Sequence, residues 1–112
     1  MFRMFDEWRD HGTFDDEAWR KSLASQQQPA RPHRFQLVAM QRLSEMAMVM
    51  DQRNAALYTL TAVSQFGLID IVWIDHCPLF TSLHGDPTFD AARGVIAERA
   101  SRVLTAFRAA RG

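Results

Sequence analysis

Hydrophobic residues recur at three- and four-residue intervals along most of the chain, which is the spacing of amphipathic helices. One run extends from His33 to Met50 and a second from about Gln52 to Phe66. The short turn between them requires the two helices to pack antiparallel, as a helical hairpin. The pattern places Met40 and Met48 outside the apolar stripe. The expected core positions are Phe35, Ala39, Leu43, Met46, Ala47 and Met50, then Ala56, Leu57, Leu60, Val63 and Phe66.

Capping residues predict where the helices begin and end. Gly67 follows the second helix, where a left-handed C-cap is expected. Asp86 and Pro87 form an N-cap and first-turn pair that opens a last helix. That helix should run almost to Ala110. Its apolar stripe consists of Phe89, Ala92, Ile96, Ala100, Val103 and Phe107.

The segment from 68 to 74 is rich in β-branched and aromatic residues, which favours a strand locally. No second convincing strand is present in the sequence to pair with it, and an isolated strand leaves its backbone groups without partners. We therefore predict a helix from about Ile69 to His76, ended by Cys77 and Pro78.

The N-terminal part predicts two shorter helices, at residues 2–10 and 14–26, with Thr13 as N-cap of the second. A glutamine run and two prolines then interrupt the helical pattern. The chain thus divides into an N-terminal helical arm (1–28), a linker (29–32) and a helical domain (33–112).

Charge and composition narrow the possible functions. The 112 residues hold 13 basic and 13 acidic side chains and one cysteine. A zero net charge argues against nucleic acid as a partner, and the single cysteine argues against a disulfide framework. No apolar run suits a membrane span or a signal peptide, so a cytoplasmic location is expected. The charge is uneven, because residues 91–112 carry five arginines and one glutamate.

Three motifs follow the hairpin: Gly67-Leu68-Ile69-Asp70, then Trp73 to Phe80 (WIDHCPLF), then Leu83 to Phe89 (LHGDPTF). With the long Arg/Ala helix after them, they resemble the C-terminal tetratricopeptide-like helical region of bacterial serine/threonine protein kinases and related multidomain signalling regulators, over residues 33–107. The resemblance implies an all-α fold: a tetratricopeptide-like hairpin plus C-terminal capping helices, with the short helical N-terminal arm ahead of it. The glycine-rich, His-Arg-Asp and Asp-Phe-Gly motifs of the kinase domain are absent, so kinase activity does not carry over.

Residues with metal-ligand or nucleophile chemistry gather between 75 and 86. Zinc prefers four donors at paired short spacings, which one cysteine beside one histidine does not supply. We expect no metal and no cofactor, and we expect Cys77 to pack as a small apolar residue at a helix end. An enzymatic role for Cys77 is the less favoured alternative. The residues concerned are Asp75, His76, Cys77, His84 and Asp86.

These observations predict a non-catalytic protein–protein interaction module in a bacterial signalling or regulatory assembly. Its partner would be a protein, a peptide or a second copy of the chain, held on the exposed side of the hairpin. The candidate contact residues, which fall off the apolar stripe, are Gln41, Arg42, Arg53 and Tyr58. The alternative is a small regulatory subunit that docks to a larger enzyme, or self-associates, through its N-terminal arm.

Overall fold

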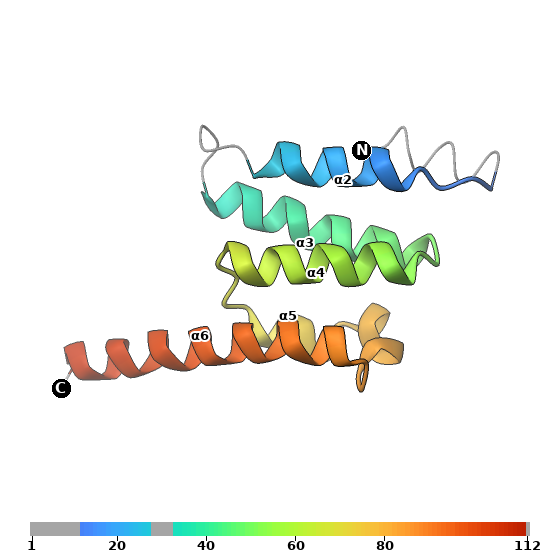
Figure 1. Ribbon diagram of the computed structural model, residues 1–112. Coiled ribbons are helices and arrows are strands. Elements are labelled where there is room, and N and C mark those ends of the chain that lie inside the picture. The colour runs from blue at the N-terminus through green and yellow to red at the C-terminus, as the bar shows by residue number, and fades with distance from the viewer. Residues whose placement is uncertain (1–11, 28–32, 112) are drawn as a thin grey trace.

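The computed structural model describes residues 12–27 and 33–111, and all regular structure within them is helical (Figure 1). The all-α fold expected from the sequence is therefore confirmed. The helices are α2 (Asp16–Gln26), α3 (His33–Val49), α4 (Arg53–Phe66), α5 (Ile71–His76), the 3₁₀ helix η1 (Pro78–Leu83) and α6 (Pro87–Arg111). The helix predicted at residues 2–10 and the linker at 29–32 lie outside the described residues.

Helices α3 and α4 form the predicted antiparallel hairpin, and the other helices pack around it (Figure 1). Helix α4 is central, because it contacts α3, α6 and α2. The 3₁₀ helix η1 packs against α3, while α5 packs against α6 and η1. The molecule thus has two layers, one containing α2, α4 and α6 and the other containing α3, α5 and η1.

Aspartate side chains cap three of the helices. The Asp86 carboxylate accepts hydrogen bonds from the backbone N–H groups of Thr88 (2.8 Å) and Phe89 (3.3 Å), which confirms the predicted start of α6. Helix α2 is capped by Asp15, which accepts from the Ala18 N–H at 3.0 Å. The prediction that Thr13 caps this helix was wrong, because the carboxylate two residues later reaches the free N–H instead.

The stretch with strand-like composition is helical from Ile71 to His76, so the predicted helix is confirmed, but it begins two residues after the expected Ile69. Helix α5 begins at Ile71, and the Asp70 carboxylate accepts from the Trp73 N–H at 3.0 Å. Gly67 precedes this segment with a φ of 124°, a backbone conformation that L side chains rarely adopt. The sequence did not predict η1, in which Pro78 occupies the first turn. This turn brings Phe80 and Leu83 into the core.

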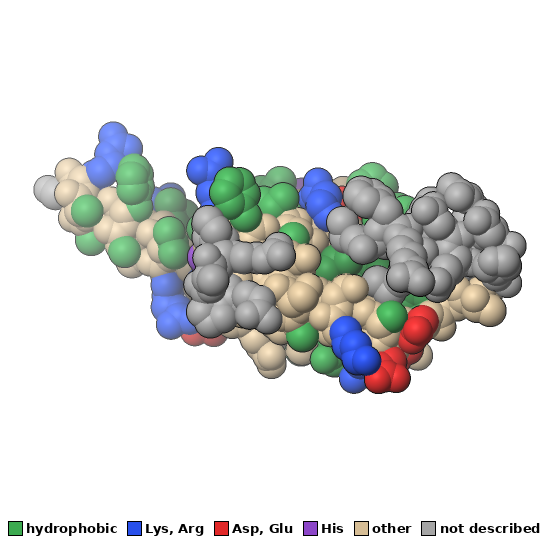
Figure 2. All heavy atoms as spheres, turned by 90° about the horizontal axis from the view of Figure 1, so that it is seen from above, with side chains coloured by type: hydrophobic (Ala, Val, Ile, Leu, Met, Phe, Trp, Pro, Cys, Tyr) green, Lys and Arg blue, Asp and Glu red, His purple; other side chains and the backbone are tan. Residues whose placement is uncertain are grey.

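Helix α6 projects well past the end of the α3–α4 hairpin (Figure 1), and Figure 2 shows hydrophobic and arginine side chains along the projecting part. Its first half buries Phe89, Ala92 and Ile96, but every residue from 101 to 111 is exposed. The expectation that Val103 and Phe107 belong to the core was therefore wrong, because no described element covers them. No described helix, α6 included, is both long and apolar enough to cross a membrane.

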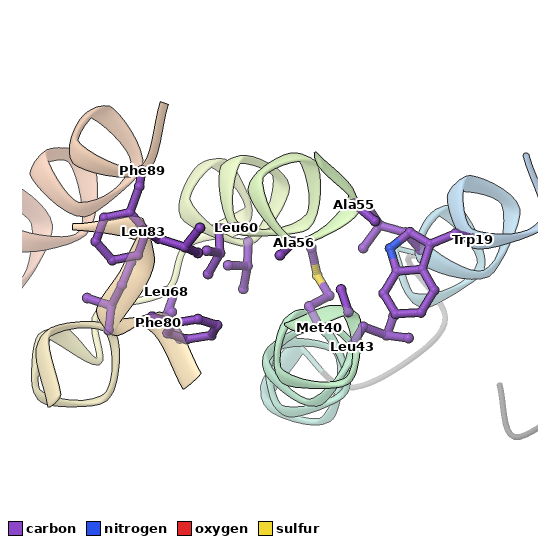
Figure 3. Packing of buried hydrophobic residues seen from close by; sticks show 14 of the residues in the cluster. Trp19, Met40, Leu43, Ala55, Ala56, Leu60, Leu68, Phe80, Leu83 and Phe89 are labelled. Atoms are coloured by element: carbon purple, nitrogen blue, oxygen red, sulfur yellow. The ribbon is translucent and has the colours of Figure 1, made fainter. Parts of the chain in front are cut away.

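The core lies between the two layers (Figure 3). On α3, Met40 is fully buried and Phe35 is exposed, so both predictions for these residues were wrong. The buried side of α3 is turned slightly from the predicted one, because α3 packs against three elements, α4, α2 and η1. The large, fully buried side chains are Trp19, Leu23, Met40, Leu43, Met50, Leu60, Val63, Ile74, Phe80, Leu83, Phe89 and Ile96.

Helix α2 contributes to this same core. Trp19 is fully buried, and its indole Nε1–H donates to the Thr59 hydroxyl oxygen on α4 at 2.9 Å. The Thr59 hydroxyl donates in turn to the Ala55 carbonyl at 2.7 Å. Leu23, one turn after Trp19, is also buried. The described part of the segment expected as an arm is thus packed into the helical domain.

Candidate interaction surface on helix α3

The four candidate contact residues do not share one surface. Gln41 is only 8% exposed, so its side chain is not available to a partner. Arg53 is exposed, but its guanidinium is already engaged, because it donates to the Ser82 carbonyl and to Asp86, each at 3.2 Å. It thereby joins the start of α4 to the η1–α6 connection.

Tyr58 lies on α4, in the other layer from α3. The Arg20 guanidinium of α2 stacks over its ring, 4.2 Å from the centroid. Tyr58 is 42% exposed, but this contact holds its ring against α2. Only Arg42 is on the outward side of α3, exposed to solvent.

Arg42 belongs to a row of outward-facing residues that we call the α3 stripe: Phe35, Val38, Arg42, Glu45 and Val49. Successive members are three or four residues apart, so their side chains leave one side of the helix. Phe35 is 69% exposed, Val38 48% and Val49 52%. In the middle of the stripe, the Arg42 Nε donates to Glu45 Oε1 at 2.6 Å. The stripe therefore has apolar ends and an ion pair at its centre.

The stripe lies on a well-anchored helix. Leu43 and Ala47, on the opposite side of α3, are fully buried against the core. At its start, the His33 ring stacks on Phe66 of α4, with centroids 4.7 Å apart. At its end, Met50 is fully buried, which fixes the turn into α4. The exposed side chains are therefore presented on a rigid support and lose little backbone entropy when a partner binds.

The sequence did not identify the apolar ends of this stripe. Periodicity placed Phe35 in the core, because it lies at helical spacing from Ala39 and Leu43. A usable signal was present in the row itself: Val38, Arg42, Glu45 and Val49 follow one another at intervals of four, three and four residues. A charged pair within an apolar row indicates a side of the helix that faces solvent.

The cluster between residues 75 and 86 is used in packing and ion pairs. The Arg93 guanidinium donates to both carboxylate oxygens of Asp75, at 2.5 and 2.9 Å. This hydrogen bonding, together with the charge of Arg93, lowers the pKa of Asp75 against the opposing effect of burial. His84 lies against the Phe89 ring, with centroids 4.8 Å apart. Cys77 is half-buried and packs on the core.

The carboxylate of Asp86, like that of Asp75, is held by hydrogen bonds. Burial would raise its pKa, but hydrogen bonds from Phe89, Thr88 and Arg53 outweigh burial and lower the pKa of this carboxyl. Within residues 12–27 and 33–111, no three His, Cys, Asp or Glu side chains are grouped so that they could hold a metal ion. The arrangement of these side chains serves to join α4, α5 and α6.

Two shallow grooves flank α4. The larger, of about 370 Å³, lies between α4 and α6 and is lined by small and amide side chains without a titratable group: Thr61, Ser64, Gln65, Pro87, Thr88, Ala91, Ala92 and Val95. The smaller, of about 200 Å³, lies between α2 and α4, and includes Arg20 and Tyr58. Neither groove brings a nucleophile and a base together.

Comparison of the chain with protein families, curated proteins and solved structures finds no match. The candidate surface is therefore defined by geometry alone.

Proposed function

We propose that the protein is a non-catalytic protein–protein interaction module, and that the α3 stripe is its contact surface. The observation that carries the proposal is the exposure of Phe35, Val38 and Val49 along one side of a helix whose other side is fully buried. An apolar row of this kind, interrupted by polar residues, is typical of helices that bind another helix.

The tetratricopeptide-like interpretation is part of this proposal, and the packing of the helices is what supports it. Helices α3 and α4 form a hairpin, and α5, η1 and α6 pack beside it as a second, irregular unit. Repeats of this class present one of their layers to a partner. A cytoplasmic bacterial signalling assembly is the setting that the resemblance predicts for such a module.

The pattern of the stripe favours a second copy of the chain as the occupant. The order Val38, Arg42, Glu45, Val49, at intervals of four, three and four residues, reads the same in either direction as apolar, charged, charged, apolar. A twofold axis between Arg42 and Glu45 would place two α3 helices antiparallel. Each arginine would then lie opposite the glutamate of the second copy, and each Val38 opposite Val49 of the second copy.

Such a contact satisfies the self-complementarity that a twofold interface requires. It uses one helix face from each copy, so its area is at the small end of specific interfaces. We therefore expect a dissociation constant in the micromolar range. The ion pairs between the copies would fix the register, and the valines and Phe35 would supply most of the affinity.

Substitutions in the stripe test this proposal through the molar mass measured by light scattering after gel filtration. Val38→Asp should weaken dimerisation about tenfold or more, because it places a carboxylate in the apolar end of the contact. The matched control is Val95→Asp, which adds the same charge at a similarly exposed valine on α6. Equal loss of dimer in both variants would refute the role of the stripe.

A charge exchange tests the register independently. Arg42→Glu alone sets like charges against each other and should favour the monomer, whereas Arg42→Glu combined with Glu45→Arg should restore the dimer. Both positions are on the surface, so circular dichroism should show unchanged helix content in every variant. A double variant as monomeric as the single variant would contradict the antiparallel pairing.

A further inference from the structure

The second half of α6 has an apolar side that no described element covers. Phe107 lies 18 residues after Phe89, which is about five helical turns, so the two rings leave α6 in the same direction. Phe89 is fully buried, but Phe107 is 57% exposed. Val103 and Leu104, on the same side, are each about half exposed. We call residues 101–111 the α6 arm.

The arm begins where the contacts of α6 with the hairpin end. Arg99 Nη1 donates to two backbone carbonyls, that of Ser64 at the end of α4 (2.6 Å) and that of Leu68 (2.9 Å). These bonds satisfy carbonyls left free where α4 ends and hold α6 in place. The apolar side of α6 is buried up to Ile96. It continues along residues 101–111, where α6 extends past the end of the α3–α4 hairpin (Figure 1).

The arm is strongly basic. Residues 101–111 contain Arg102, Arg108 and Arg111 and no acidic residue. Arg102 points away from the apolar side of the arm, toward Glu98, with 3.9 Å between Arg102 Nε and Glu98 Oε1. Arg108 and Arg111 border the apolar side, and the Arg111 guanidinium lies 5.6 Å from the Phe107 ring centroid. Figure 2 shows hydrophobic side chains along this projecting part, with arginine at its end.

We propose that the α6 arm is a second binding surface, and that its occupant is an acidic amphipathic helix of another protein. The apolar side of that helix would cover Val103, Leu104 and Phe107, and its carboxylates would reach Arg108 and Arg111. The helix dipole by itself accounts for arginines in a last turn, but it does not account for three exposed apolar side chains beside them.

Geometry and charge favour this occupant over two others. A second copy of the arm would set three arginines against three, with no acidic residue in either segment to offset them. The other helices lie on the same side of α6 as its exposed apolar residues. A flat lipid bilayer could therefore not reach these residues without meeting the rest of the protein. A single acidic helix can lie along the arm, cover its exposed apolar side and pair with its arginines.

The surface is tested with two synthetic helical peptides and the full chain, by fluorescence anisotropy. Both peptides are about three turns long and share leucines at helical spacing; one carries glutamates at the remaining positions and the other lysines. We expect the glutamate peptide to bind about tenfold or more tightly than the lysine peptide. Equal binding of the two, or no binding of either, would overturn the proposal.

Variants of the arm locate the binding. Phe107→Ala should weaken the glutamate peptide about tenfold, as loss of a central aromatic contact does. Arg108→Ala with Arg111→Ala should weaken it as well and should reduce its dependence on salt. Val95→Ala, an exposed valine on another side of the same helix, should bind as the wild type does. Loss of affinity in Val95→Ala equal to that in Phe107→Ala would refute the assignment.

Two further outcomes separate the competing occupants and the two surfaces. Binding of the chain to phosphatidylglycerol vesicles, with no binding of the glutamate peptide, would replace the helix with a membrane and overturn the proposal. A drop of the molar mass to that of the monomer in Phe107→Ala would show that the arm joins two copies, and would also overturn it. If the Val38→Asp variant is monomeric and still binds the glutamate peptide, self-association is located on α3 and peptide binding on the α6 arm. That result supports both proposals.

Discussion

Removing the indole of Trp19 should destabilise the whole helical domain, because this side chain joins α2 to α4. Trp19 is fully buried, and its Nε1–H donates to the Thr59 hydroxyl at 2.9 Å. Phe14 lies on the ring as well, with centroids 5.5 Å apart. Trp19→Ala leaves a large cavity and deprives Thr59 of its buried donor. Trp19→Phe keeps most of the ring and removes the hydrogen bond.

The expected losses can be ranked from these contacts. Replacing a buried tryptophan by alanine costs about 3–5 kcal/mol, mostly from the cavity and the lost apolar contacts. Trp19→Phe should cost about 1–2 kcal/mol, which is one buried hydrogen bond and a few packed atoms. A domain of this size is stable by roughly 6–17 kcal/mol, so the alanine variant should remain folded but lose a large share of its stability.

Urea unfolding followed by circular dichroism measures these changes. With a slope of about 2 kcal/mol/M, a loss of about 4 kcal/mol shifts the midpoint of Trp19→Ala by about 2 M. The matched control is Lys21→Ala, since the Lys21 side chain is exposed and pairs with Glu17 on the surface. It should change stability by less than about 0.5 kcal/mol. An unchanged midpoint in Trp19→Ala, or a separate early transition for α2, would refute the assignment of α2 to the core.

Three further substitutions probe other parts of the fold by the same assay. Arg93→Ala should cost about 1 kcal/mol at neutral pH. Because Asp75 has a lowered pKa in the folded state, this difference should shrink as the pH falls below 3.8, and a constant difference would contradict it. Ile96→Ala should cost about 2–5 kcal/mol and Val103→Ala less than about 0.5; similar costs would contradict the end of the core after Ile96. Gly67→Ala should cost about 1–2 kcal/mol, because alanine is strained at the φ of 124° that Gly67 adopts. A neutral result would contradict this backbone conformation.

Helix boundaries could be predicted from the sequence because they depend on local chemistry. Asp86 and Pro87 open α6 through side-chain acceptance and a preset φ, which are properties of those residues alone. The strand-like composition of residues 68–74 does not produce a strand, because the sequence offers no partner strand, and a helix begins at Ile71 instead. The start of α2 was missed by two residues because two capping candidates, Thr13 and Asp15, lie close together and the second one caps the helix.

Burial was less predictable, because it depends on what packs against each helix. The stripe of α6 keeps its period through Val103 and Phe107, but the hairpin that covers it ends near Arg99. On α3, three neighbours rather than one decide the buried side, which brings Met40 in and leaves Phe35 out. A period identifies a side of a helix and does not say which element covers it.

The candidate site was predictable in part. The sequence predicted the outward position of Arg42, because this residue falls off the apolar side of its helix. The structure places it on the exposed side of α3. Gln41 and Arg53 could not be judged from the sequence, because burial of the first and the ion pair of the second involve residues far along the chain. The exposure of Phe35 at one end of the α3 stripe was missed, because it depends on which side of α3 packs against the other helices.

The molar mass of the wild-type chain in solution tests the proposed function most directly. Sedimentation equilibrium from low micromolar to several hundred micromolar protein should show the mass rising from 12.9 kDa toward twice that value. The rise should be absent from Val38→Asp and present in Val95→Asp. A wild-type mass of 12.9 kDa at every concentration would contradict the account, because the α3 stripe would then not join two copies.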